Sequence, residues 1–201
     1  MSEIIIESSS KFPSIGIKDK KFFKIYYSGK EGNHSTFFFE ILNEINLDKV
    51  ELMLITIGPG RFTSLRVGLS FALGLAIPRK IKIVPLVTFD IIEHKISNNY
   101  SDYGIFLKKG GEGFLFRKKG EDKIYVVKEL TPSIPLFTFE PAQINLDYTL
   151  VILDPIIIYE FYEKKRDKVI ETVEYEKIKP LYSFLPYEKS LVEKGKIKGY
   201  S

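Results

Sequence analysis

The sequence predicts an α/β protein, and three observations point to that class. Short apolar runs bounded by turn residues read as buried strands. Two longer segments carry apolar residues at helical spacing. Beyond the first three strands, strands and helices alternate along the chain. In the first half of the chain the expected strands are residues 4–6, 14–18, 22–27, 52–57 and 81–84, and the expected helices are 35–45, 63–77 and one that begins near Thr88.

Local signals set the boundaries of these elements. The serines at 8–10 end the first strand, and the charged residues at 19–21 form a short turn between the next two. Because the residue before a proline disfavours the helical region, the second helix is expected to stop at Ile77, before Pro78. Thr88 is expected to cap the third helix with its side chain.

The element order is β-β-β-α-β-α-β-α. A three-stranded antiparallel meander followed by βα units describes one lobe of the actin-like (ASKHA, ribonuclease-H-like) fold, whereas a doubly wound sheet would alternate strand and helix from the start. We therefore predict a complete N-terminal lobe over residues 1–97.

The second half, residues 98–201, is expected to be a reduced C-terminal lobe with a lysine-rich tail. Its expected strands are residues 104–107, 114–117, 123–127 and 149–153, and residues 156–165 are its one expected helix. Prolines at 132, 135 and 141 predict an irregular connection. The basic hairpins that contain Lys108, Lys109, Arg117, Lys118 and Lys119 are expected to be solvated edges blunted by lysine, and contact with nucleic-acid phosphates is the alternative.

Composition excludes several kinds of site. The 201 residues include no cysteine, which removes disulfides, thiolate metal sites and a cysteine nucleophile. The only histidines, His34 and His94, fall on different helices, so no metal-binding histidine pair can form and no metal site is expected. The net charge is +4, from 30 basic and 26 acidic residues, which permits but does not require an acidic partner. With no signal peptide and no apolar run long enough for a membrane span, we expect a cytoplasmic protein without membrane contact.

One segment resembles a known family. The run Gly-Pro-Gly-Arg-Phe-Thr-Ser-Leu-Arg-Val-Gly-Leu begins at Gly58 and leads into a helix rich in glycine and alanine. It is similar to the TsaB (YeaZ) family, which carries a Gly-Pro-Gly turn, Phe-Thr and Leu-Arg at this place. The resemblance covers residues 1 to about 95 well and the remainder weakly. The turn-motif residues are Gly58, Pro59, Gly60, Phe62, Thr63 and Arg66.

The resemblance implies a subunit of the machinery that makes threonylcarbamoyladenosine (t6A) in tRNA. Members of the family are catalytically silent scaffolds that pair with the catalytic subunit TsaD, form homodimers when alone, and work beside a TsaE-like ATPase. Contact with tRNA would be indirect. We expect no catalytic residue and no cofactor in this chain, with at most weak ATP or ADP binding at the interface of the complex. A peptidase label could be attached to such a chain through its catalytic relatives.

An alternative interpretation is an actin-like nucleotide-binding protein or small kinase that uses Glu7 and the Gly58 loop. ATP-hydrolysing proteins of this fold carry an aspartate where Glu7 stands. The other interpretation of Glu7 is a strand-end carboxylate that accepts hydrogen bonds from the amides of Ser8 or Ser9. Pro59 removes an amide that a phosphate loop would use, and no lysine follows the turn. The glycines would then serve to turn the chain sharply, and Arg66 would pair with an acid, either of a partner or of this chain.

The first two predicted helices are expected to form the partner interface. Small residues recur every four positions on the second helix, and no charge occurs between Val67 and Ile77. A helix with only one sheet-facing stripe would carry polar residues opposite. The alternative is a helix buried wholly within its own domain. The expected interface residues are His34, Phe37, Phe38, Ile41, Leu65, Gly68, Leu69, Ala72, Leu73 and Ala76.

Overall fold

The computed structural model describes residues 2–109, 113–130 and 133–181. Its first sheet has the strand order β3-β2-β1-β4-β5. The first three strands form the predicted antiparallel meander, and β4 and β5 join β1 in parallel. The strands are β1 (Ser2–Glu7), β2 (Ser14–Asp19), β3 (Phe23–Tyr27), β4 (Val50–Gly58) and β5 (Lys82–Val87).

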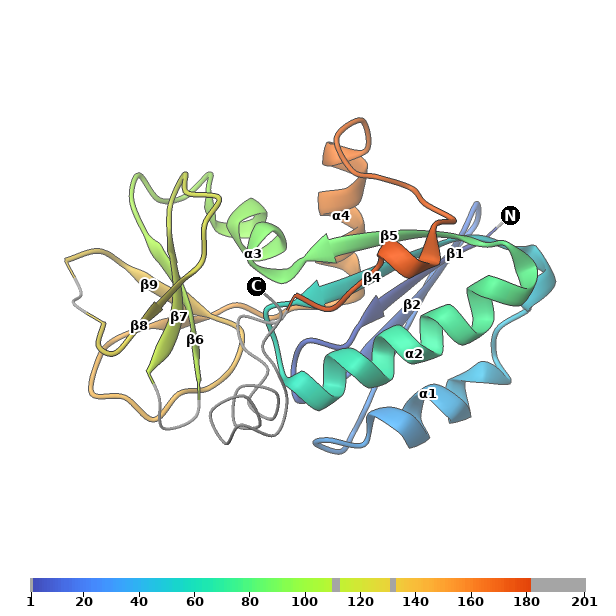
Figure 1. Cartoon of the computed structure of the whole chain (residues 1–201), viewed down its shortest axis with the longest axis horizontal. Coiled ribbons are helices and arrows are strands. Elements are labelled where there is room, and N and C mark those ends of the chain that lie inside the picture. Colours follow the sequence, from blue (N-terminus) through green and yellow to red (C-terminus); the bar gives the residue numbers. More distant parts are fainter. Residues whose placement is uncertain (1, 110–112, 131–132, 182–201) are drawn as a thin grey trace, which may run out of the picture.

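Helices cover both faces of this sheet (Figure 1). On one face α1 and α2 lie side by side over Ile4, Ile6, Met53 and Ile55. On the other face α3 and α4 cover a second cluster that includes Ile5. The four helices are α1 (His34–Leu42), α2 (Phe62–Arg79), α3 (Thr88–Ile96) and α4 (Pro155–Lys165), and short 3-10 turns occur at Leu47–Lys49 and Tyr175–Lys177.

The second sheet has the order β10-β9-β6-β7-β8. Its apolar face continues the core beneath α3 and α4, and its other face is covered by a small cluster around Phe106. The last expected strand, residues 149–153, is shorter than predicted, because β10 ends at Leu150. The strands are β6 (Gly104–Lys108), β7 (Phe114–Lys118), β8 (Tyr125–Val127), β9 (Leu136–Thr138) and β10 (Thr149–Leu150).

Two boundary predictions are wrong. α2 continues through Pro78 to Arg79, because near the end of a helix a proline costs only one hydrogen bond. The C-cap residue that follows the helix is Lys80, whose φ is 55°. Thr88 is the first residue of α3 rather than a side-chain cap, and the N-cap residue is Val87. The Thr88 hydroxyl lies instead 2.7 Å from the Ser9 hydroxyl in the loop after β1.

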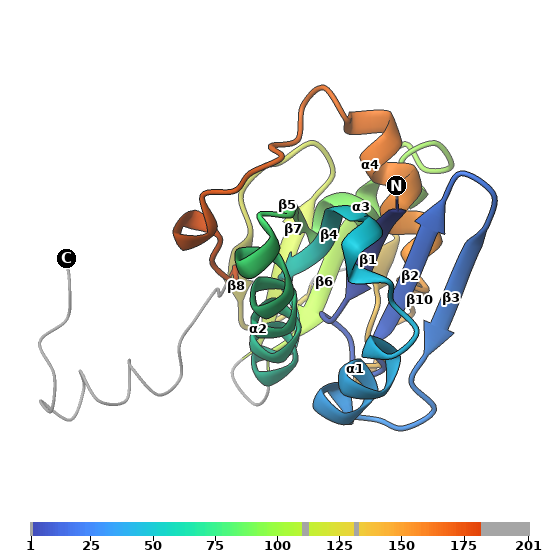
Figure 2. The ribbon, with the colours of Figure 1, turned by 90° about the vertical axis from the view of Figure 1, so that its right-hand side faces the viewer.

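α4 comes from the second half of the chain but packs on the first sheet. It contacts β1, β2 and β4, and Figure 2 shows it across that sheet from α1 and α2. Asp154 caps the helix by accepting a hydrogen bond of 3.0 Å from the amide of Ile157. The division into lobes at residue 97 stays a prediction. The expected lysine-rich tail lies outside the described residues.

Candidate functional site

The loop that follows β1 holds a buried carboxylate. Glu7 is fully buried. Its Oε1 accepts hydrogen bonds from the amides of Ser9 (2.6 Å) and Ser10 (3.0 Å), and its Oε2 accepts one from the Ser10 hydroxyl (2.7 Å). Burial raises the pKa of Glu7 to about 7, although the hydrogen bonds from Ser10 and Ser9 oppose the shift. The carboxylate is thus engaged by its own loop.

This geometry resembles the strand-end interpretation of Glu7, with one difference in partners. The amides that bind the carboxylate are those of Ser9 and Ser10, whereas the Ser8 amide donates to the Thr56 hydroxyl at 3.1 Å.

Within residues 2–109, 113–130 and 133–181, no group of three acidic or histidine side chains is placed to hold a metal ion.

The Gly58–Pro59–Gly60 turn brings the end of β4 against the same loop. Gly58 has a φ of +111°, a conformation that favours glycine. A Cβ on Gly60 would lie 2.6 Å from the carbonyl oxygen of Ser9, and the Arg61 amide donates to that oxygen at 2.8 Å. The backbone conformation of Gly58 and the close packing of Gly60 against Ser9 therefore explain why glycine stands at both positions, without a ligand.

An ion-pair cluster beside the turn joins the two halves of the chain. The Arg61 guanidinium lies 3.0 Å from Glu31 and 3.4 Å from Glu140, which follows β9. Glu140 also accepts a hydrogen bond of 2.5 Å from the amide of Lys11. Burial raises the pKa of Glu140, and Arg61 opposes that shift. Sequence reasoning missed this cluster, because no local pattern relates residues so far apart in the chain.

The expected interface residues are brought together, but not at the surface. Nine of the ten lie in the core of the chain itself, and Leu73 is half-buried. Gly68 packs so closely on the Ser8 side chain that a Cβ there would collide with the Ser8 hydroxyl. Phe38 stacks on Phe71 with ring centroids 5.0 Å apart. The small-residue stripe therefore packs α2 against its own sheet and α1.

The outward side of the two helices is also apolar. Phe39 of α1 is 71% exposed, because three consecutive residues of a helix point in different directions and Phe37 and Phe38 face inward. Leu42 of α1 and Val67 and Phe71 of α2 are half-buried, and Gly74 of α2 is exposed. We name these five residues, Phe39, Leu42, Val67, Phe71 and Gly74, the outer face.

The guanidinium of Arg66 lies 5.3 Å over the Phe62 ring, and no described acid forms an ion pair with it.

Arg117 is another residue whose role the sequence did not reveal. It is 3% exposed rather than solvated. Its guanidinium pairs with Asp90 at 2.5 Å and Glu93 at 3.0 Å, both on α3. The pairing ties the second sheet to α3. None of the helices among the described residues is long and apolar enough to cross a membrane.

Comparisons with known proteins agree over most of the chain. A family model described as "TsaD: tRNA N6-adenosine threonylcarbamoyltransferase" matches residues 34–107. The tRNA threonylcarbamoyladenosine biosynthesis protein TsaB of Buchnera aphidicola subsp. Acyrthosiphon pisum (strain APS) is 28% identical, over 96% of this chain and 88% of that protein.

Two solved structures from Pseudomonas aeruginosa share the fold. One, described as an uncharacterized protein with similarity to peptidase YEAZ, gives a TM-score of 0.66 at 13% identity, covering 90% of this chain and 98% of that one. The other, YeaZ, gives 0.65 at 14% identity, covering 90% and 99%. The actin-like, ribonuclease-H-like α/β fold predicted from the element order is confirmed. The chain is thus similar to TsaB over most of its length and shares the fold of the YeaZ structures.

Proposed function

We propose that this chain is a non-catalytic subunit of the machinery that makes t6A in tRNA, and that its outer face binds a TsaD-like catalytic subunit. The curated relative is a t6A biosynthesis protein by name, and the TsaD model matches the segment that contains both helices of the outer face. Alone, the chain forms a homodimer through the same face. A TsaE-like ATPase completes the machinery, and contact with tRNA is indirect.

The observation that carries this proposal is the exposure of Phe39 on α1, which packs beside the uncharged residues 67–77 of α2. A single exposed phenylalanine is ordinary, but Phe39 (71% exposed) stands on α1, which packs beside the uncharged residues 67–77 of α2, and contiguous apolar surface marks an interaction site. The neighbouring Gly74 has open space where a Cβ would lie, so the backbone of another helix can approach closely there. Such a face fits a helix pair of a partner better than it fits a small ligand.

The absence of a catalytic role is supported by how the acids of the site are used. The Glu7 carboxylate binds the Ser9 and Ser10 amides. Glu140 binds Arg61 and the Lys11 amide. In this arrangement neither acid is left to hold a metal-bound water or phosphate.

Phe39→Arg tests the proposal, because it places a charge at the centre of the outer face without entering the core. Light scattering on a sizing column should show that the wild-type chain is a dimer and forms a stable complex with TsaD of the same organism. Phe39→Arg should abolish both. Leu69→Arg is unsuitable, because Leu69 is only 6% exposed and the substitution would unfold the domain.

Ile152→Arg is the matched control. Ile152 is 75% exposed and lies outside both helices, so the same change there should leave both assemblies intact. Equal assembly by Phe39→Arg and wild type, with both variants folded by circular dichroism, would exclude the outer face as the interface. Failure of the wild-type chain to bind TsaD at all would exclude the partnership.

A further inference from the structure

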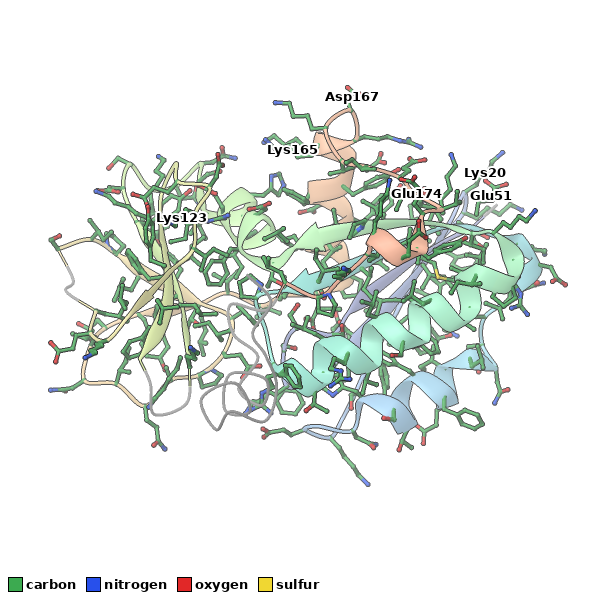
Figure 3. The ribbon with its side chains drawn as sticks, viewed as in Figure 1. Lys20, Glu51, Lys123, Lys165, Asp167 and Glu174 are labelled. Atoms are coloured by element: carbon green, nitrogen blue, oxygen red, sulfur yellow. The ribbon has the colours of Figure 1, made fainter. Side chains whose placement is uncertain are left out.

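A pocket lies where α3 and α4 meet the second sheet. It has a volume of about 490 Å³, and residues of α3, of β7, of the turn after β7 and of the end of α4 line it. Lys165 extends from the end of α4 on the side where α3 lies (Figure 3). The pocket therefore joins the two halves of the chain, on the face of the first sheet that is turned away from α1 and α2.

Three lysines at the end of α4 give this pocket a positive charge. Lys164 and Lys165 lie in the last turn of the helix, and Lys168 follows one turn later, so all three reach the same pocket. Their ammonium groups form no ion pair or hydrogen bond with another of the described residues. A basic last turn complements the partial negative charge of a helix end, but Lys168 lies beyond the helix. The three lysines are thus available to an anion.

The carboxylates of the pocket do not neutralise these lysines. Asp90 and Glu93 share the guanidinium of Arg117, at 2.5 and 3.0 Å. Among the described residues that line the pocket, the remaining acid is Asp122, which is exposed. Arg117 and the three lysines therefore face three carboxylates, and the lining carries a net positive charge.

Arg117 gives an independent indication of a ligand. Its side chain is only 4% exposed and lines the pocket. Its Nε is buried and has no hydrogen-bond partner among the described residues. Buried polar groups in proteins nearly always have a partner. An anion in the pocket, with the water that it holds, supplies one.

His94 reports the sign of the potential at this place. The ring lines the pocket and is half-buried. Burial lowers the pKa of His94, and Lys164 lowers it further, although Glu160 opposes the shift. Lys165 and Lys95 also lower the pKa of this ring. The surrounding charges therefore repel a further proton, as a site for an anion requires.

Apolar side chains form another part of the lining. Phe161 is 7% exposed and Val169 is half-buried. The ring of His94 packs edge-on against Phe161, with centroids 5.7 Å apart. A pocket of this volume is larger than a bare phosphate ion, so it has room for an organic group beside the lysines.

We propose that this pocket binds a phosphate monoester, with the phosphate among the ammonium groups of Lys164, Lys165 and Lys168 and the organic group on Phe161 and Val169. Three ammonium groups match a phosphate dianion better than they match a single carboxylate. The inference does not rest on the proposed function, because it needs neither a partner chain nor the outer face.

Histidine NMR of the isolated chain tests the site, with inorganic phosphate and phenyl phosphate as probes. The sequence has two histidines, so each ring gives a separate signal. His94 lines the pocket, whereas His34 lies on α1 across the sheet. Either probe, added at constant ionic strength against chloride, should shift the His94 signals in a saturable way and raise the pKa of His94, and should leave His34 unchanged. Phenyl phosphate should bind at least about fivefold tighter than inorganic phosphate, because its ring covers Phe161 and Val169.

Two double variants separate this site from a general effect of net charge. Lys165→Gln with Lys168→Gln should weaken the binding of both probes at least about tenfold. Lys20→Gln with Lys49→Gln removes the same charge from exposed positions outside the pocket and should bind like wild type. The site is overturned if His94 stays unmoved, if both histidines respond alike, or if the two double variants bind equally. Equal affinity for the two probes would overturn the assignment of an ester.

Discussion

Glu7→Gln should stabilise the protein at alkaline pH and have little effect at acid pH. The carboxyl group has a pKa of about 7 in the folded chain against an ordinary value of 4.5. Below pH 4.5 both folded and unfolded chains hold the proton. Between pH 4.5 and 7 the unfolded chain loses it while the folded chain keeps it, so the free energy of unfolding falls as pH rises. At 1.36 kcal/mol per pH unit, the loss reaches about 3 kcal/mol above pH 7.

Glutamine fits the same hydrogen bonds. Its carbonyl oxygen can accept from the amides of Ser9 and Ser10, and its NH₂ group can donate to the Ser10 hydroxyl oxygen. The Ser10 hydroxyl proton, which Glu7 Oε2 accepts in the wild type, can then turn to the Phe12 carbonyl 2.9 Å away. The variant should therefore lack the pH-dependent loss and exceed wild type by up to about 3 kcal/mol at pH 8.5.

Urea unfolding from pH 4.5 to 8.5, followed by circular dichroism, measures the difference. Glu51→Gln is the control, because Glu51 is exposed at the start of β4, where Figure 3 labels it, and should give no such trend. A Glu7→Gln difference that stays constant with pH, or that favours wild type at pH 8.5, would refute the argument that burial rather than hydrogen bonding dominates the pKa of Glu7.

Two further substitutions test the packing of α2 and the junction of the sheets. Gly68→Ala should destabilise the chain by about 1–3 kcal/mol, because its Cβ would collide with Ser8. Gly74→Ala has open space around its Cβ and should stabilise α2 by up to about 1 kcal/mol. Thermal unfolding measures both changes, and equal effects on stability would contradict the packing of Gly68 against Ser8. Arg117→Met should lower the free energy of unfolding by about 3 kcal/mol at neutral pH, since it leaves two carboxylates of α3 without their cation. The loss of stability should shrink at acid pH, where the two carboxylates become protonated. A loss that does not change with pH would exclude the ion pairs as its source.

The first half of the fold was predictable because its signals are local. Turn residues separate the meander strands, and the apolar spacing of α1 and α2 gives helices at the right places. β9 was missed, because it is three residues long and lies among prolines that predicted a loop. Its pairing with β6 and β10 is set by contacts distant in sequence, which no periodicity records.

The candidate site was harder to predict for a physical reason. Uncharged residues at positions 67–77 indicate burial, but they do not say whether a partner or the chain itself provides the cover. The structure places Gly68, Ala72 and Ala76 inward and leaves Gly74 outward. Arg117 was expected in solvent because its neighbours are basic, whereas its own position in β7 faces the carboxylates of α3. Which face of a strand is buried depends on packing, and a run of charges hides that pattern.

The return of α4 to the first sheet has a consequence for how the chain is made. During synthesis the strands β1 to β5 emerge first, with α1, α2 and α3 between and beside them. The part of the sheet formed by β1 and β2 then stays bare on one face until the whole second sheet and α4 have left the ribosome. The N-terminal half therefore cannot complete its hydrophobic core before α4 has been synthesised. The helix that covers this face, α4, is made only after the second sheet, so the two halves complete their folding together.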